Sequence, residues 1–350
     1  PVARALENSV AAFCVYRADE AVALRDAGVA TPILVLGPLE RDELEAAHDA
    51  GAAIALWNRG AFLHDARRLA TRSGTPVRVH VKIDTGVTRL GLDAANAADA
   101  IAAYLDDEAL AVGGAFTHLA AAEELESAYT LAQLERFSDA LAPLAGRLAE
   151  RGVVRHAAAS AAAMLFPKSR LDMIRAGIAT YGIWPSRETR HAAAHAIELE
   201  PALAWTTDVV VVRDVEAGRP VGYGCTYETT RPSRIGVLPI GYAEGLPRAL
   251  SGAGEALVGG RRVPFVGRLC MNMSFVDLTD VPDARTGSRV TLVGRDGNER
   301  IDANDLAEAA GTIGYEILAR LPSEMRRRYV EGGRARSTAS IASARSSVPS

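Results

Sequence analysis

The feature that most constrains the fold is an alternation of short apolar runs with amphipathic stretches along the first half of the chain. Seven runs rich in aliphatic side chains lie at 11–15, 32–37, 52–57, 77–84, 112–120, 153–160 and 174–182. Continuous apolar runs of this length between helices are typical of parallel strands buried on both faces. The stretch between the first two runs is amphipathic and ends at Gly28, a residue type that commonly stops helices. Repeated strand–helix units therefore predict a parallel α/β sheet.

Seven strands are compatible with an open doubly wound sheet or with an eight-stranded barrel. The open sheet is disfavoured because no Gly-x-Gly-x-x-Gly loop follows the first run. The barrel needs eight strands, and the sequence begins with Pro1 rather than with methionine. We interpret the first residues as part of the first helix, with one strand missing upstream. The pattern therefore favours a TIM-type (α/β)8 barrel that lacks its first strand.

The pattern changes beyond about Glu198. Segments there are short, rich in valine and bounded by Gly, Pro and Asp, which is typical of antiparallel strands. A helix follows, for which Asp302 or Asn304 is a suitable N-cap. We expect a cofactor-binding α/β barrel over 1–195 and a mostly antiparallel β domain over 196–330. The Ser- and Arg-rich tail 331–350 lacks apolar periodicity and is expected to be disordered.

Composition disfavours several classes of protein. The 39 basic and 43 acidic residues leave a net charge of −4, which argues against a broad nucleic-acid-binding surface. The three cysteines, Cys14, Cys225 and Cys270, are far apart, suggest no disulfide framework and fit a reducing cytoplasm. We find no apolar run of about 18 residues and no signal peptide, so no membrane association is expected. The only lysines are Lys82 and Lys168, so chemistry that needs an amine has two candidates.

We expect site residues where barrel strands end, because function in such barrels lies at the carboxyl ends of the strands. Lys82 lies on a strand expected to be buried, where an unpaired ammonium is costly. It either pairs with Asp84 or forms an anion site with Arg89, whose guanidinium suits a carboxylate. His118 lies near the end of the next run and could be structural or functional.

The last two runs of the first half supply further candidates. Ser160 closes a run of alanines, which suits either a phosphate or tight helix–strand packing. Arg175 lies inside an apolar run and needs a partner or a ligand there. The backbone N–H groups of Gly177 and Ile178 could bind a phosphate, since phosphate sites recur after the last barrel strands.

The second half adds three tyrosines and a strand end. Tyr223 stands between two glycines, Tyr242 lies in a Gly-rich loop, and Tyr315 opens the segment GYEIL. Met271 lies at the centre of the Cys-Met-Asn sequence 270–272, which ends a strand. By itself each of these residues is compatible with an ordinary turn or core position.

Taken together and in order, these segments resemble the motifs of bacterial alanine racemase, a fold-type III enzyme that uses pyridoxal 5′-phosphate (PLP). The segments are KIDTGVTRLG, HAAASAAA, IRAGIATYG, VGYGCTY, VLPIGYAEGLPR, GRLCMNM and IGYEIL, and the resemblance extends to about Tyr329. It implies an α/β barrel followed by a β domain, and PLP-dependent racemisation of L-alanine and D-alanine. It also implies a cytoplasmic homodimer with shared active sites that supplies D-alanine for peptidoglycan, and no metal.

The resemblance implies a role for each candidate residue. Tyr223 would be an acid/base group in the active site of the partner subunit. Arg175 would face the pyridine nitrogen of PLP, and His118 would join Arg175 to the catalytic tyrosine through hydrogen bonds. The phosphate would be held by Ser160, by the backbone of Gly177 and Ile178, and by Tyr315.

On the substrate side, the resemblance implies that Arg89 orients the substrate or cofactor region beside a carbamylated Lys82. The Met271 backbone would contact substrate across the dimer, and Tyr242 would line the substrate entrance. Two positions depart from the family pattern: Asn272 replaces the usual aspartate, and Ala159 replaces the usual asparagine.

The third departure is the covalent lysine. The family carries its Schiff-base lysine in a KA-x-AYGHG motif at the end of the first barrel strand, and this motif is absent here. Lys82 occupies the carbamate position, and Lys168 lies in a later loop. We therefore expect an N-terminally truncated alanine racemase that is inactive as it stands.

Three alternatives remain open: a serine or broad-spectrum amino-acid racemase, a fold-type III decarboxylase, and a non-enzymatic degenerate homologue. The codons upstream of Pro1 distinguish an enzyme from a degenerate homologue. An in-frame KA-x-AYGHG motif supports the enzyme, and a stop codon supports the inactive protein.

Overall fold

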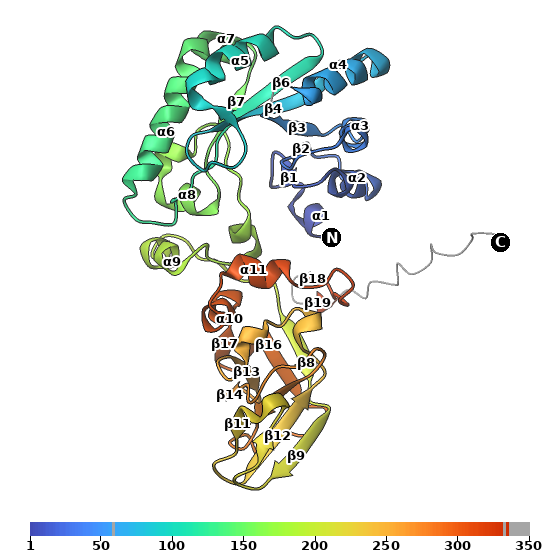
Figure 1. The fold of residues 1–350 in the computed structure, drawn as a ribbon, viewed down its shortest axis with the longest axis vertical. Helices are drawn as coiled ribbons and strands as arrows, with labels where there is room; N and C mark the ends of the chain where they lie inside the picture. The colour runs from blue at the N-terminus through green and yellow to red at the C-terminus, as the bar shows by residue number, and fades with distance from the viewer. Residues whose placement is uncertain (58–59, 332–333, 336–350) are drawn as a thin grey trace, which may run out of the picture.

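The computed structural model describes residues 1–57, 60–331 and 334–335. The chain forms two halves, an α/β half from the N-terminus and a β half that follows it (Figure 1). Most of the tail predicted to be disordered, 331–350, lies outside the described residues. Its described part contributes to a short antiparallel pair of β18 (Val330–Glu331) with β19 (Arg334–Ala335).

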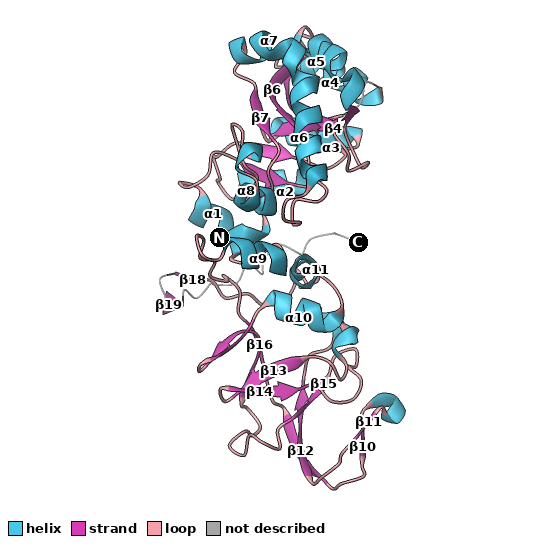
Figure 2. Ribbon diagram, turned by 90° about the vertical axis from the view of Figure 1, so that its left-hand side faces the viewer, coloured by secondary structure: helices cyan, strands magenta, loops and turns pink. Residues whose placement is uncertain are grey.

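The α/β half is built on a curled parallel sheet whose strands follow one another in chain order. These are β1 (Phe13–Val15), β2 (Ile33–Val35), β3 (Ala53–Leu56), β4 (Val77–Asp84), β6 (Leu110–Phe116) and β7 (Val154–His156), with β5 (Leu92–Asp93) paired to β4. The helices of this half are α1 (Val2–Leu6), α2 (Ala18–Asp26), α3 (Arg41–Asp49), α4 (Ala61–Ser73), α5 (Ala97–Leu105), α6 (Ala128–Leu141), α7 (Ala145–Glu150), α8 (Ser160–Leu165) and α9 (Arg187–Ala193). Figure 2 shows helices packed around these strands.

Strand β4 shows how the sequence divides the sheet into two faces. Val77, Val79, Val81 and Ile83 are fully buried in the core that the helices cover. The alternating residues of the strand point to the opposite face, because successive side chains in a strand alternate. That face carries Arg78, His80, Lys82 and Asp84. The inner face of the curled sheet is therefore polar, and it receives the candidate site residues.

The β half consists of antiparallel sheets. One has the order β15 (Ser274–Asp277), β12 (Ser233–Leu238), β9 (Val211–Val215). Another joins β14 (Arg261–Pro264), β13 (Glu255–Val258), β16 (Arg289–Asp296) and β17 (Glu299–Ile301), with β8 (Trp205–Asp208) paired to β16, and a short pair joins β10 (Pro220–Val221) to β11 (Tyr227–Glu228). The expected fold class, a TIM-type α/β barrel sheet followed by a mostly antiparallel β domain, is confirmed.

The predicted seventh strand at 174–182 is wrong. Arg175 N donates to Ala158 O at 2.9 Å, but Gly177 then turns the chain with φ −110° and ψ −96°. The next residues form the 3-10 helix η4 (Ile178–Tyr181). Ile178 is buried in the hydrophobic core of the β half, together with Ile183. The apolar run therefore marks a segment that packs into the core of the β half rather than a strand of the parallel sheet.

Two helices of the β half lie at the junction with the α/β half (Figure 2). They are α10 (Ala303–Ala310) and α11 (Gly314–Ala319). Asp302 is the N-cap of α10 and accepts hydrogen bonds from Asn304 N and Asp305 N, which decides between the two predicted caps. The side chain of Asn304 instead donates to Trp184 O at 3.0 Å and so joins the halves. The predicted domain boundary at 195/196 stays a prediction. Among the described helices, none is long and apolar enough to cross a membrane.

Candidate active site

A chain of hydrogen bonds runs from Arg175 through two histidines on the inner face of the sheet. Arg175 NH1 lies 2.7 Å from His156 Nδ1, and His156 Nε2 lies 2.9 Å from His80 Nδ1. An arginine can only donate, so His156 Nδ1 must accept and His156 Nε2 must carry the hydrogen. His80 Nδ1 then accepts in turn, which leaves the proton of His80 on Nε2. Arg175 thus determines the tautomers of both rings.

Burial keeps these rings neutral. The His156 side chain is fully buried and stacks on Phe116 with ring centroids 4.7 Å apart. Desolvation and the Arg175 charge lower the pKa of His80 to about 4 and hold the pKa of His156 far below its usual range. Desolvation lowers the pKa of Arg175 to about 10, so the guanidinium remains charged at neutral pH.

Arg175 also joins the carboxyl ends of β6 and β7. Its Nη2 atom donates to Thr117 O at 2.8 Å and to Ala157 O at 3.0 Å. The same group lies 3.4 Å from His118 Nδ1, so the structure brings the predicted pair together. Desolvation, followed by the nearby charges of Arg175 and Arg89, lowers the pKa of His118 to about 4.

Lys82 is nearly buried on the same face, 7% exposed, with Nζ 5.7 Å from the centroid of the Phe116 ring. Desolvation, and then the charges of Arg89 and Arg175, lower the pKa of Lys82 to about 8, against the opposing effect of Asp84. Among the described residues, Lys82 and Asp84 form no ion pair. The structure therefore favours a Lys82 amine that is partly neutral at pH 8 over the alternative Lys–Asp pair.

Asp84 organises the loop that carries Arg89 instead. Its carboxylate accepts from the backbone N–H groups of residues 86–89, at 2.8 Å for Gly86 and 2.8 Å for Arg89. Gly86 adopts φ +139°, a backbone conformation that side-chain-bearing residues rarely take. The loop therefore forms a tight nest around one carboxylate, and the Arg89 side chain is exposed at its end.

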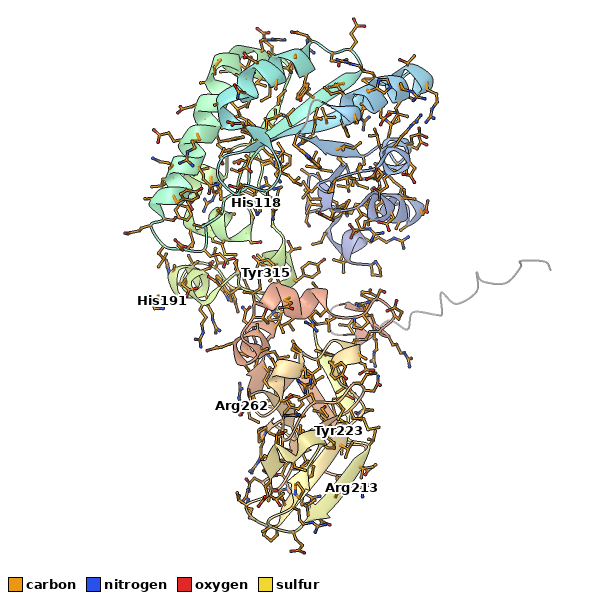
Figure 3. The ribbon with its side chains drawn as sticks, in the orientation of Figure 1. His118, His191, Arg213, Tyr223, Arg262 and Tyr315 are labelled. Carbon is orange, nitrogen blue, oxygen red and sulfur yellow. The ribbon has the colours of Figure 1, made fainter. Side chains whose placement is uncertain are left out.

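Only some of the residues predicted to hold a phosphate are in contact with one another. Ser160 Oγ, in the first turn of α8, accepts from Gly177 N at 3.0 Å and from Ala179 N at 3.3 Å. Ile178 follows Gly177 and is buried. Tyr315 reaches the same junction from α11 in the β half (Figure 3). Desolvation and a hydrogen-bonded Glu123 raise the pKa of the Tyr315 hydroxyl to about 12.

A second cluster of predicted residues lies in the β half. Within one chain this cluster does not meet the Arg175 and His118 cluster of the α/β half. Tyr223, Tyr242 and Met271 have exposed fractions of 73%, 37% and 57%. Figure 3 places Tyr223 in the β half and His118 in the α/β half. Two left-handed glycines beside Tyr223, with φ +75° and +72°, form the turn that presents its ring to solvent.

The loops of this second cluster are joined by Asn272, the residue that departs from the family pattern. Asn272 Nδ2 donates to Glu244 Oε1 at 2.7 Å, and Glu244 Oε2 accepts from Gly241 N at 2.8 Å. Tyr242 N also donates to Cys270 O at 3.2 Å. An amide at 272 can donate to the carboxylate where an aspartate would repel it.

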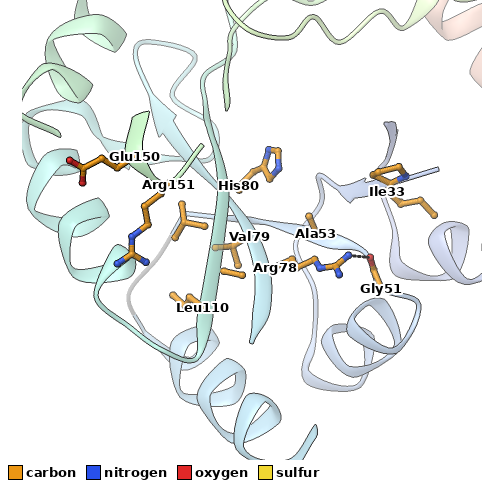
Figure 4. A pocket seen from close by; sticks show the side chains of 13 residues that line it. Ile33, Gly51, Ala53, Arg78, Val79, His80, Leu110, Glu150 and Arg151 are labelled. Atoms are coloured by element: carbon orange, nitrogen blue, oxygen red, sulfur yellow. Dashed lines mark hydrogen bonds between the residues drawn. The ribbon is translucent and has the colours of Figure 1, made fainter. Parts of the chain in front are cut away.

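His156 and His80 are site residues that were not among the residues predicted from the sequence. A usable signal was present, because His80 and Lys82 are two residues apart on one strand and so share a face. A cavity of about 730 Å³ also has His80 in its wall (Figure 4). Its lining comes from the first residues of β2, β3, β4 and β6, so it lies at the amino ends of the strands, away from the predicted residues.

Comparisons with known proteins decide the family. The family model described as alanine racemase, N-terminal domain, matches residues 1–185, and that of the alanine racemase C-terminal domain matches residues 202–329. The chain belongs to the alanine racemase family. Members are isomerases, so this membership makes the chain an enzyme of that class.

Individual relatives agree with the family models. Alanine racemase from Symbiobacterium thermophilum is 41% identical over 330 residues, which cover 94% of this chain and 86% of the relative. The crystal structure of alanine racemase from Bacillus anthracis with bound L-Ala-P has a TM-score of 0.82 at 33% identity, covering 95% of this chain and 84% of that one. An alanine racemase from Clostridium difficile 630 has a TM-score of 0.84 at 31% identity, covering 96% and 86%.

The histidines on the inner face give a first test. His80 and His118 should remain neutral down to about pH 5, because their pKa of about 4 lies below the ordinary value of 6.5. The unfolded chain then binds more protons, so these groups stabilise the fold above pH 6.5 and this contribution is lost as pH falls toward 4. NMR titration of the imidazoles, with the urea-unfolded chain as reference, measures both states. Titration of either folded ring near 6.5 would contradict the geometry.

The Asn272–Glu244 contact gives a second test. Asn272→Asp places two carboxylates at hydrogen-bond distance in an exposed contact, which should lower the free energy of unfolding by about 0.2–1 kcal/mol at pH 8. Repulsion raises the pKa of one carboxyl in the folded state, so the loss should shrink as pH falls and that group binds a proton. Urea unfolding at pH 8 and pH 5 measures the effect. The double variant N272D/E244Q is the control and should recover stability at pH 8; equal losses at both pH values argue against the pair.

Proposed function

We propose that the protein that carries this sequence catalyses the PLP-dependent interconversion of L-alanine and D-alanine. The observation that carries the proposal is the Arg175 guanidinium, held on His156 and on two strand-end carbonyls at the site where the family binds its cofactor. The family resemblance further supports a cytoplasmic enzyme that supplies D-alanine for peptidoglycan. When bound, PLP supplies a conjugated ring that accepts electron density as the α-proton leaves.

The residues present fit the cofactor. The hydroxyl of Ser160 and the N–H of Gly177 lie within hydrogen-bond reach of each other among small residues, which suits a phosphate. Ser160, the backbone of Gly177 and Ile178, and Tyr315 would hold the phosphate, and Arg175 would face the ring nitrogen. Because Arg175 does not give up its proton, it would leave that nitrogen unprotonated. A weaker electron sink limits side reactions such as transamination.

Racemisation needs two proton-transfer groups, one on each face of the α-carbon. We assign one to Tyr223, whose phenol can donate a proton and whose phenolate can accept one. His118 can stabilise the phenolate. Its Nδ1 faces Arg175 at 3.4 Å, and its low pKa keeps it neutral. A neutral His118 that accepts from Arg175 at Nδ1 presents an N–H at Nε2, which can stabilise a phenolate.

A homodimer would unite the two clusters. Tyr223 is highly exposed and belongs to the half opposite His118, so a two-fold arrangement could place it over the partner's barrel mouth. Tyr242 would then line the substrate entrance, and the Met271 backbone would contact substrate across the dimer. Arg89 would orient the substrate carboxylate from the barrel side.

Neither lysine of this sequence occupies the position that the family resemblance gives to the Schiff-base lysine. Lys168 is exposed in the 3-10 helix η3 (Pro167–Ser169), and Lys82 lies beside Phe116 and near Arg89. We assign Lys82 to carbamylation, and we expect these 350 residues by themselves to bind PLP without a covalent bond and without turnover. Borohydride reduction of the PLP-loaded chain should therefore leave no pyridoxyl group on either lysine.

Substitution of Tyr223 tests the catalytic assignment. In the protein that carries this sequence, Tyr223→Phe should lower kcat/KM for racemisation by about 10²–10⁴-fold, the usual contribution of an acid/base group, and by the same factor in both directions because the two enantiomers have equal free energies. Rates from L-alanine and from D-alanine are measured separately by chiral chromatography. Tyr242→Phe is the matched control and should change KM more than kcat. Full activity of Tyr223→Phe in both directions would exclude Tyr223 as the base.

Carbon dioxide labelling tests the role of Lys82. Its neutral amine attacks the carbon of CO₂ and releases one proton to solvent, giving a carbamate. With ¹³C-bicarbonate, an NMR carbamate signal should be present at pH 8 and weaker at pH 6, because the pKa of Lys82 is about 8 and the ammonium cannot react. Lys82→Arg should remove the signal and Lys168→Arg should retain it. A signal that survives in Lys82→Arg refutes the assignment.

A further inference from the structure

Gln133 is a fully buried polar residue in the middle of α6, and it contacts two strand-end segments of the active site. Its Oε1 accepts from Ala120 N at 2.8 Å, and its Nε2 donates to His118 O at 3.1 Å. The same Nε2 lies 3.4 Å from Thr85 Oγ1, in the loop after β4. One side chain therefore links the segment that carries His118 to the loop that carries Arg89.

The orientation of the Gln133 amide is unambiguous. A backbone N–H can only donate and a backbone carbonyl can only accept, so the oxygen must face Ala120 and the nitrogen must face His118. Both hydrogens of Nε2 then have acceptors. Thr85 Oγ1, which accepts from Gln133, lies 2.8 Å from Thr117 Oγ1, and both hydroxyls are buried. The hydrogen bonds thus continue from one segment into the other.

Three other side chains donate hydrogen bonds to backbone carbonyls of the two segments. On α6, Tyr129 donates to Gly86 O at 2.7 Å and Arg136 donates to Thr85 O at 2.8 Å. On the sheet side, Arg175 donates to Thr117 O at 2.8 Å. Each of these contacts reaches one segment. Gln133 contacts both segments from α6, and the Thr85 and Thr117 hydroxyls also join them directly.

We propose that Gln133 is a positioning residue that sets the spacing between the His118 segment and the Arg89 loop. The roles of His118 and Arg89 rest on the proposed function, but the link itself does not. A mispositioned His118 segment would alter the contact with Arg175, and a shifted loop would move Arg89 relative to Lys82. Gln133 does not touch the reacting atoms, and its effect passes through the backbone of these two segments.

Hydrogen–deuterium exchange of the full chain tests the link without turnover, so failure of the proposed reaction leaves this test intact. Gln133→Leu should speed exchange of the Ala120 amide by at least about tenfold and of the 86–89 amides by about threefold, because buried hydrogen bonds are lost. Arg136→Met, the matched control on α6, removes the bond to Thr85 O and should affect the 86–89 amides alone. In Gln133→Leu the pKa of His118 should also rise from about 4 toward its ordinary value, a change that NMR detects.

Gln133→Glu keeps the volume of the side chain and separates the two contacts. One carboxyl oxygen can still accept from Ala120, and the ionised carboxylate no longer donates to His118 O, whereas a protonated carboxyl can. Ala120 should therefore stay protected in this variant, while amides 86–89 exchange faster, relative to the wild type, as pH rises and the carboxyl ionises. The proposal is overturned if Gln133→Leu changes exchange in one segment alone.

Discussion

The Arg175 guanidinium is the interaction on which the rest of the site depends. Charged nitrogen donors surrounded by protein need acceptors, because an unpaired buried donor costs about 1–3 kcal/mol and a charged one costs more. Arg175 finds these acceptors in His156 Nδ1 and in the carbonyls of Thr117 and Ala157. It thereby joins the ends of two neighbouring strands and makes His156, and then His80, accept at Nδ1.

The same requirement organises the loop after β4. Asp84 satisfies its carboxylate with four backbone N–H groups and forms no ion pair with Lys82 among the described residues. Desolvation, and then the charges of Arg89 and Arg175, lower the pKa of Lys82 to about 8. Buried hydrogen bonds then hold this loop beside the His118 segment. Gln133 on α6 contacts both, and the Thr85 hydroxyl pairs with that of Thr117. The α/β half is a scaffold that supplies cations and neutral imidazoles, while the exposed tyrosine belongs to the other half.

Much of the fold could be predicted from local pattern, and the failures have physical causes. Six apolar runs are strands, but 174–182 is not, because Gly177 turns the chain and Ile178 packs into the other half. Apolar composition reports burial and does not report whether a strand has a neighbour. His156 and His80 were not predicted because each is recognised as a site residue only through its hydrogen bond to the other, which lies 76 residues away in the sequence.

The sequence by itself determined the kinds of element and the kinds of chemical group. Periodicity and turn residues are local, so the division into a parallel α/β half and an antiparallel β half can be read directly, and so can the motifs that carry Arg175, Tyr223 and Ser160. Only the tertiary structure decided which groups meet. Asp84 binds its own loop rather than Lys82, His156 stands between Arg175 and His80, and Gln133 joins two strand ends. These contacts depend on where each strand ends and which way its side chains face, and both are properties of the assembled sheet.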